Sequence, residues 1–155
     1  MRTTSMCKPI EFIIKRIFFD QEPYIWIISE NNRKARSFLR KIKRIALKMQ
    51  ASGWDIRPGY IWNENESEFI VNGVVCGVAV FGAGEDPMGC TLIKSGQRPT
   101  LVTLDVILFR QKEKNKEQRE KFKEWFYSDL KPAVHVKGEI ITVSFLKDDE
   151  DDFDE

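Results

Sequence analysis

Residues 24–50 read YIWIISENNRKARSFLRKIKRIALKMQ, and the change of pattern inside this stretch is the main guide to the fold. Residues 24–29 are almost all β-branched or aromatic, which predicts a strand. Farther along, apolar residues recur at steps of one and three, which places them on one face of a helix. These apolar positions are Phe38, Leu39, Ile42, Ile45, Ala46 and Met49. Asn31 or Asn32 is expected to cap the helix, and Gly53 to end it.

Strand-like segments flank this region on both sides. Residues 10–19 (IEFIIKRIFF) are rich in Ile and Phe and predict another strand, with a hairpin to residues 24–29 as one arrangement. Asn72-Gly73 predicts a hairpin turn within 68–81. The other expected elements are strands at 60–62, 101–109 and 139–146, and a second helix at 112–130.

This order of elements predicts an α+β fold. Strands that adjoin in sequence favour a mostly antiparallel sheet, either twisted or closed into a small barrel, packed by two helices. A five-stranded barrel of the OB type with an added helix is one version. We expect residues 1–147 to form one domain, and residues 148–155 to be a disordered acidic tail, because they cannot bury apolar surface.

The charges are distributed unevenly along the chain. The formal net charge is only +1, from 25 basic and 24 acidic residues. Seven of the acids lie in the last eight positions, which leaves 17 acids against 25 bases, or +8, in residues 1–147. A basic body joined to an acidic tail favours a nucleic-acid or protein partner.

Composition also narrows the cellular setting. The three cysteines are widely spaced and form no C-x-x-C pair, which argues against a disulfide framework or a zinc site and favours a reducing cytoplasm. No uncharged apolar run is long enough to cross a membrane, and residues 1–20 do not have the pattern of a signal peptide. We expect a cytoplasmic protein without membrane contact, in the bacterial host if a phage encodes it.

The predicted helix at 31–50 carries the candidate nucleic-acid contacts. No acid interrupts residues 31–54, whereas the second helix mixes Lys with Glu as ordinary solvated helices do. Clustered cations attract phosphates, and aromatic rings stack on single-stranded bases. The predicted phosphate contacts are Arg33, Arg36, Arg40, Lys41, Arg44, Lys48 and Arg57, and the predicted stacking residues are Tyr24, Trp26, Trp54, Tyr60 and Trp62. The alternative is that the rings belong to the core and the charges to an ordinary solvated face.

The C-terminal residues resemble a known family. The tail consists of Asp148, Asp149, Glu150, Asp151, Asp152, Phe153, Asp154 and Glu155. An aromatic residue among acids resembles the C-terminal tails of bacterial and phage single-stranded DNA-binding proteins, although here the aromatic is not terminal and no proline precedes it. The resemblance implies that the tail recruits replication or recombination proteins and competes with DNA for a basic groove.

Enzymatic chemistry has less support in the sequence. The glycine-containing loop at 82–89 lacks the G-K-[ST] ending of a phosphate loop. Glu64, Glu66, Glu68 and Asp105 are the only carboxylates that suggest a two-metal nuclease, and a solvated edge strand is the favoured explanation of the three glutamates.

Taken together, these features predict a non-enzymatic phage protein that binds single-stranded DNA or RNA, with no cofactor and no metal. The alternative hypothesis is a protein-interaction module that modulates a host enzyme, using the acidic tail as a nucleic-acid mimic. The sequence does not define the oligomeric state.

Overall fold

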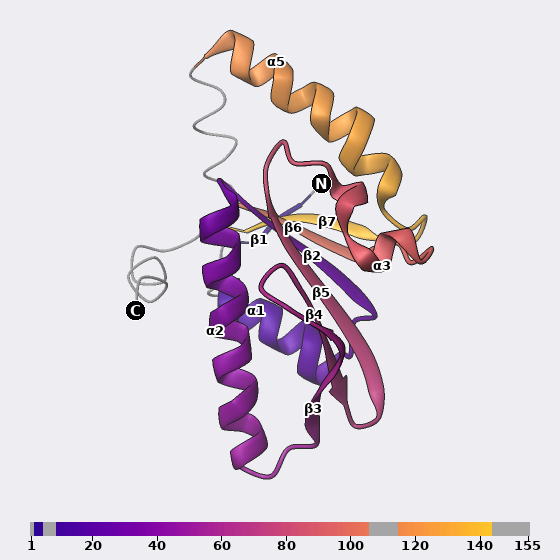
Figure 1. Cartoon of the computed structure of the whole chain (residues 1–155). Helices are drawn as coiled ribbons and strands as arrows, with labels where there is room; N and C mark the ends of the chain where they lie inside the picture. Colours follow the sequence, from indigo (N-terminus) through magenta and orange to yellow (C-terminus); the bar gives the residue numbers. More distant parts are fainter. Residues whose placement is uncertain (1, 5–8, 106–114, 144–155) are drawn as a thin grey trace.

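A computed structural model of the chain describes residues 2–4, 9–105 and 115–143. Within these residues, seven strands form one sheet in the order β1-β7-β6-β2-β5-β4-β3 (Figure 1). The first five strands in this order are parallel to one another, and β4 and β3 extend the sheet by antiparallel pairing. The strands are β1 Arg2–Thr4, β2 Tyr24–Ser29, β3 Ile56–Trp62, β4 Glu66–Val71, β5 Val74–Gly82, β6 Leu101–Asp105 and β7 Glu139–Val143.

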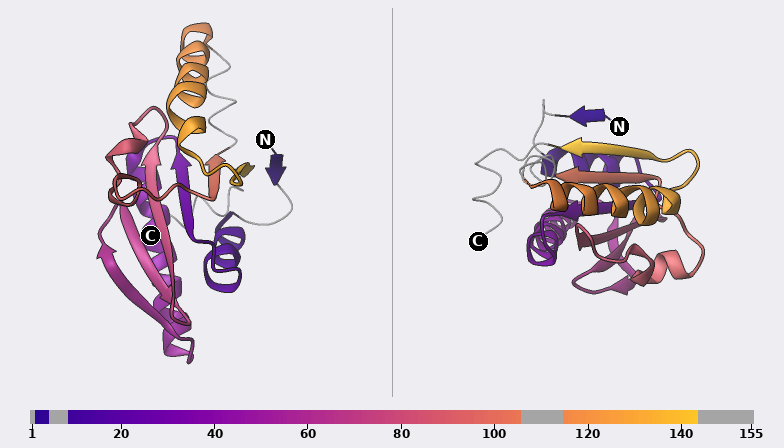
Figure 2. Two further views of the ribbon diagram at one scale, coloured as in Figure 1. Left: turned by 90° about the vertical axis from the view of Figure 1, so that its right-hand side faces the viewer. Right: turned by 90° about the horizontal axis from the view of Figure 1, so that it is seen from above.

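Helices cover both faces of the sheet and give a three-layer arrangement (Figures 1 and 2). One face packs against α1, η1 and α2, and the other packs against α3, α5, η3 and η4. The helices are α1 Pro9–Ile14, η1 Lys15–Phe19, α2 Asn32–Ala51, η2 Pro87–Gly89, α3 Thr91–Lys94, α5 Lys116–Trp125, η3 Phe126–Leu130 and η4 Lys131–Ala133. No helix in the described part of the chain combines the length and apolar character that crossing a bilayer requires.

Strand β2 lies at the centre of these layers and is buried along its whole length. Ile25 and Ile27 point into the core formed with α1 and α2, while Tyr24, Trp26 and Ile28 point into the core on the α5 side. Successive side chains of a strand point to opposite faces, so a strand covered on both sides needs an unbroken apolar run. The predicted strand at 24–29 is confirmed, and its burial on both faces is a finding of the structure.

Helix α2 also follows the prediction closely. The side chain of Asn31 caps the helix by accepting a hydrogen bond from the backbone N–H of Lys34 at 2.9 Å. The chain leaves the helix through Gly53, whose φ of 103° is in the left-handed region that glycine tolerates. The predicted apolar positions Phe38, Leu39 and Ile42 are buried against the sheet.

The predicted strand at residues 10–19 is wrong, because these residues form α1 and η1. Ile10, Ile13, Ile17 and Phe18 are all buried in one core cluster. Their spacing of three, four and one residues is that of a helix face. The high content of Ile and Phe suggested a strand, but the period favours a helix that packs beside α2.

The α+β class is confirmed, whereas the mostly antiparallel or barrel-like sheet is not. Within the described sheet, antiparallel pairing is confined to β3, β4 and β5, and β1 and β3 are the two edge strands. The hairpin turn at Asn72-Gly73 is confirmed, with φ of 50° and 83°. The second helix is present from Lys116 to Leu130, and residues 106–114 lie outside the described part. Helical crossovers between distant strands make the rest of the sheet parallel.

Candidate functional site

The parallel strands end together at one edge of the sheet. Thr4 of β1 and Asp105 of β6 are both in register with Val143 of β7, which lies between them. On the other side of β6, β2 ends at Ser29, which is in register with Gly82 of β5. In open sheets of this kind, ligands bind outside the carboxyl ends of the strands. This edge is therefore the first place to look for a functional site.

Asp105 is the acidic residue that the fold places at this edge. It is the last residue of β6 and is only 5% exposed. A buried carboxylate is retained only where hydrogen bonds, charges or a metal ion compensate for its lost hydration. It stands at the carboxyl end of the middle strand of the parallel set.

Strand β1, which precedes α1 in the chain, lies two strands away from β6 and Asp105. Residues 5–8 link the end of β1 to the start of α1, so the order is strand, short connection, helix, as in a phosphate-binding P-loop. Residues 4–9 read TSMCKP, which puts Lys8 directly before the helix, where a P-loop has its lysine. The P-loop glycines are missing, since the first glycine of the chain is Gly53, and Pro9 stands where Ser or Thr is usual.

A polar pocket of about 670 Å³ lies where α2 begins, beside the loop that follows β5. Arg36, at its rim, forms an ion pair with Glu64 at 3.3 Å and donates a hydrogen bond to the side chain of Asn32. Two hydrogen bonds hold this loop in place. The Glu85 carboxylate accepts one from the backbone N–H of Gly82, and the Glu85 backbone carbonyl accepts the other from the indole N–H of Trp125 at 2.9 Å. The pocket is lined by Asn32, Arg36, Asn63, Asn65, Glu66, Val80, Phe81, Glu85, Asp86, Gly89 and Cys90.

Glu66 has a structural role at the floor of this pocket. Its side-chain oxygens accept hydrogen bonds from the backbone N–H groups of Thr91 at 2.7 Å and Leu92 at 3.2 Å. The expectation that Glu64, Glu66 and Glu68 form one solvated face is therefore wrong for Glu66, which is 6% exposed. Glu68 is half-buried and accepts from the N–H of Ile61 at 2.9 Å. Within residues 2–4, 9–105 and 115–143, no three His, Cys, Asp or Glu side chains converge as metal ligands would.

Burial and nearby acids suppress ionisation around Cys90. Desolvation, reinforced by the charge of Glu66, raises the pKa of the Cys90 thiol to about 12. Desolvation also raises the pKa of the Tyr24 hydroxyl well above its ordinary value. The thiol of Cys76 is buried on the opposite face of the sheet, and its pKa is raised to about 11. Neither thiol is suited to act as a nucleophile, because the thiolate is the reactive form.

We expect Cys90 to resist alkylation in the folded protein. At pH 8, a pKa of about 12 leaves roughly one thiol in 10⁴ ionised, so iodoacetamide should react on the order of 10³-fold more slowly than with an exposed cysteine. The rate should still be rising at pH 10, where an ordinary thiol has levelled off. Intact-mass spectrometry of a Cys7→Ser variant measures this rate, and the same protein in guanidinium gives the unfolded control. Equal rates in the two states would contradict the prediction.

The predicted phosphate contacts lie on the solvent side of α2 and at the start of β3. Arg33, Arg40, Arg44 and Lys48 are exposed. Lys41 is half-buried. Two other members of the predicted set have acidic neighbours: Arg36 has Glu64, and Arg57 has Asp55 at 3.8 Å. We call Arg33, Arg40, Arg44 and Lys48 the basic face of α2.

The predicted stacking residues do not form one surface. Tyr24 and Trp26 are 1% and 0% exposed, so a nucleic-acid base cannot reach them, and that part of the prediction is wrong. Trp54 packs edge-on against Phe19 with ring centroids 5.0 Å apart. Trp62 is partly exposed, with the ammonium of Lys43 4.5 Å from its ring centroid, and Tyr60 is fully exposed. The acidic tail, residues 148–155, lies outside the described residues.

The fold is an open sheet with helices on both faces. Comparisons with known proteins find that it is similar in structure to ATPase domains. No family model matches the chain, and no curated protein matches it. Among solved structures, it is similar to the ATPase domain of the large terminase of Thermus phage P74-26, with a TM-score of 0.59 and 10% identity over 92% of this chain. A mutant of that domain gives a TM-score of 0.55 at 12% identity. The large terminase of another thermophilic bacteriophage gives a TM-score of 0.50 at 11% identity.

The chain spans 59% of the P74-26 domain and 32% of the second terminase. At these identities the likeness shows the fold. Because the neighbours are phage large terminases and their ATPase domains, the predicted non-enzymatic single-stranded DNA-binding protein of DNA replication is contradicted, and so is the nucleic-acid-mimic alternative. The basic helix and the acidic tail had suggested a DNA-coating barrel. Helix α2 instead covers one face of a mainly parallel sheet.

The sequence analysis missed the connection between β1 and α1. Glycines mark a usual phosphate loop, and the glycine-containing loop at 82–89 instead follows β5 and leads into η2 and α3. The available signal was Lys8 before a helix-period segment, and this signal was lost when residues 10–19 were assigned to a strand.

Proposed function

We propose that this chain is a nucleotide-binding domain of the ATPase type that acts on DNA in a phage setting. The observation that carries the proposal is the pairing of Thr4 and Asp105 with Val143, which brings the end of β1 and a buried aspartate to the same edge of the sheet. The likeness to the ATPase domains of phage large terminases supports the same arrangement of strands.

Two residues fit the requirements of a nucleoside triphosphate. Lys8 precedes α1 and would supply positive charge to the phosphates. Asp105 would hold the magnesium ion that accompanies them, since carboxylates are preferred ligands of Mg²⁺. The bound Mg²⁺ would neutralise phosphate charge, and the residues of this chain would position and orient the nucleotide.

Other residues of the usual phosphate site are absent from the sequence. Without glycines in residues 4–9, the backbone N–H groups have less freedom to approach the phosphates closely. With Pro9 in place of Ser or Thr, the chain lacks the hydroxyl ligand that usually assists the aspartate. We therefore expect weaker nucleotide binding than a complete P-loop provides.

The basic face of α2 is the surface that we assign to DNA. Its four exposed cations are not interleaved with acids, because residues 31–54 contain none. A run of this kind raises the local potential and attracts a phosphate backbone irrespective of base sequence. The phage terminase neighbours support DNA as the polymer.

The proposal is tested by nucleotide binding and hydrolysis. We expect the full chain to bind a fluorescent ATP analogue in the presence of Mg²⁺ and to release phosphate from ATP, faster when DNA is added. Asp105→Asn, which keeps the size of the side chain, should lower the rate by about 100-fold, the order found when one group stabilising transition-state charge is removed. Asp55→Asn is the matched control, because Asp55 is exposed and lies at the far end of the sheet, next to β3.

A second variant tests the phosphate position by gain of function. Cys7→Gly with Pro9→Ser rebuilds the G-K-[ST] sequence around Lys8 and should tighten nucleotide binding. Circular dichroism checks that each variant folds. The proposal fails if neither the native chain nor this variant binds nucleotide at millimolar concentration while both remain folded.

A further inference from the structure

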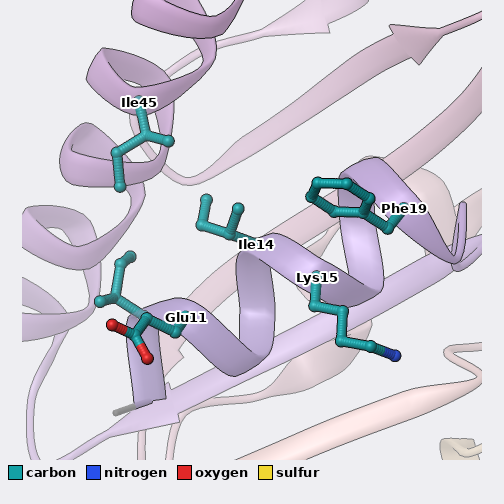
Figure 3. A pocket seen from close by; sticks show the side chains of 6 residues that line it. Glu11, Ile14, Lys15, Phe19 and Ile45 are labelled. Carbon is teal, nitrogen blue, oxygen red and sulfur yellow. The ribbon is translucent and has the colours of Figure 1, made fainter. Parts of the chain in front are cut away.

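An apolar groove lies between α1 and α2, on the sheet face opposite to α5. It has a volume of about 590 Å³ and is lined by Ile10, Glu11, Ile14, Lys15, Phe19 and Ile45. Figure 3 shows Ile14 of α1 and Ile45 of α2 on facing sides of the groove, with Phe19 at one end. Phe19 is 59% exposed, a large apolar ring that the described chain leaves accessible to solvent. The groove can therefore accept a further apolar side chain.

Basic side chains lie beside this groove, although Lys15 also forms an ion pair with Asp20 at 3.0 Å. Lys15 lines it directly and is exposed. On α2, Lys41 and Lys48 lie four residues before and three residues after Ile45, so they share its side of the helix. Glu11 is the one acid in the lining. A suitable occupant would combine one aromatic or aliphatic side chain with several carboxylates.

The acidic tail has this composition. In residues 148–155, Phe153 is the single apolar residue and the other seven are acids. A phenylalanine buries roughly 150–250 Å² when it enters an apolar site, and its acidic neighbours would face the lysines at the rim. Attachment to the same chain raises the effective concentration of the tail to the millimolar range.

The tail is also long enough to reach the groove. Val143, the last described residue before it, is in register with Thr4. Thr4 is six residues from Ile10 at the near end of the groove, a span of at most about 20 Å. Ten residues separate Val143 from Phe153 and extend to roughly 33 Å.

We propose that residues 148–155 of the same chain dock in the α1–α2 groove, with the ring of Phe153 between Ile14, Ile45 and Phe19 and the carboxylates against the surrounding lysines. This contact does not depend on nucleotide binding. It gives the tail a binding site on its own domain, and the bound tail covers the groove and neutralises part of the basic surface of α2.

The docking is tested by paramagnetic relaxation in the full chain. A nitroxide is attached at Glu155→Cys in a Cys7→Ser background, where Cys76 is fully buried and Cys90 has a raised pKa. We expect the label to broaden the methyl signals of Ile14 and Ile45 at least twofold more than those of Ile93, which lies on the opposite face. Adding Phe153→Ala should remove most of this difference, and 0.5 M salt should reduce it.

Two results would overturn the proposal. One is equal broadening of groove and reference methyls in the labelled chain. The other is selective broadening of the groove methyls that persists when spin-labelled chains without isotope are mixed with isotope-labelled chains without nitroxide, which would assign the groove to the tail of a second copy. Phe19→Ala, at an exposed position, provides a groove variant that keeps the core intact and should weaken the effect as Phe153→Ala does.

Discussion

Replacing Trp26 with alanine is expected to lower the free energy of unfolding by roughly 3–5 kcal/mol, the usual cost of removing a large buried aromatic side chain. Trp26 lies in the middle of β2, is 0% exposed, and makes edge-to-face contacts with Tyr24 and Phe81. Removing the indole leaves a cavity between the sheet and the helices on the α5 side. The close-packed neighbours on β2 and β5 can move only partly into this cavity. Because small domains are stable by about 5–15 kcal/mol, this loss is a large fraction of the total.

Urea denaturation followed by far-ultraviolet circular dichroism measures this effect. Tyr60→Ala is the matched control, because Tyr60 was predicted from the same aromatic pattern but is 100% exposed. Its replacement should change the free energy of unfolding by no more than about 0.5 kcal/mol. If the two variants have the same stability, the assignment of Trp26 to the core is wrong.

Replacing Glu66 with alanine is expected to cost about 3 kcal/mol. The change deletes a buried carboxylate and leaves the N–H groups of Thr91 and Leu92 without their acceptor, and hydrogen bonds to a charged group contribute about 1.5–3 kcal/mol each. The same two bonds join β4 to the start of α3, so the segment that leads into β6 should loosen first.

Hydrogen exchange of the Leu92 amide reports that loosening directly, and urea denaturation gives the total loss. Glu64→Ala is the matched control, because Glu64 is exposed and contributes an ion pair with Arg36. The free energy of unfolding of this variant should lie within about 0.5 kcal/mol of that of the native chain. A Glu66→Gln variant keeps one acceptor oxygen, so its stability should lie between those of Glu66→Ala and Glu64→Ala. Unchanged protection of Leu92 in Glu66→Ala would contradict the role given to this carboxylate.

The sequence predicted the elements whose signals are local. The period of residues 31–50 defined α2 with its cap, the unbroken apolar run defined β2, and Asn72-Gly73 defined the β4–β5 turn. These features depend on side chains within a few positions of one another. Residues 10–19 were assigned incorrectly because amino-acid preference was weighed above a clear helical period, and that error removed the crossover helix needed to predict parallel strands.

The candidate site depends on contacts between distant residues. Thr4, Val143 and Asp105 become neighbours through parallel pairing, and nothing in their local sequence indicates this register. The burial of Trp26 and the exposure of Tyr60 also follow from the position of each strand in the sheet, since both lie in similar aromatic runs. Charge patterns identified α2 as basic, but they did not indicate that its apolar face would border a groove shared with α1.

The pairing of β1 with β7 has a consequence for synthesis on the ribosome. Strand β1 is synthesised long before Glu139–Val143, its only partner in the described sheet. At translation rates of about 5–20 residues per second, the N-terminal segment waits several seconds or more for that strand. The edge that carries Thr4 and the β1–α1 connection is therefore completed last, after the rest of the sheet has had time to fold.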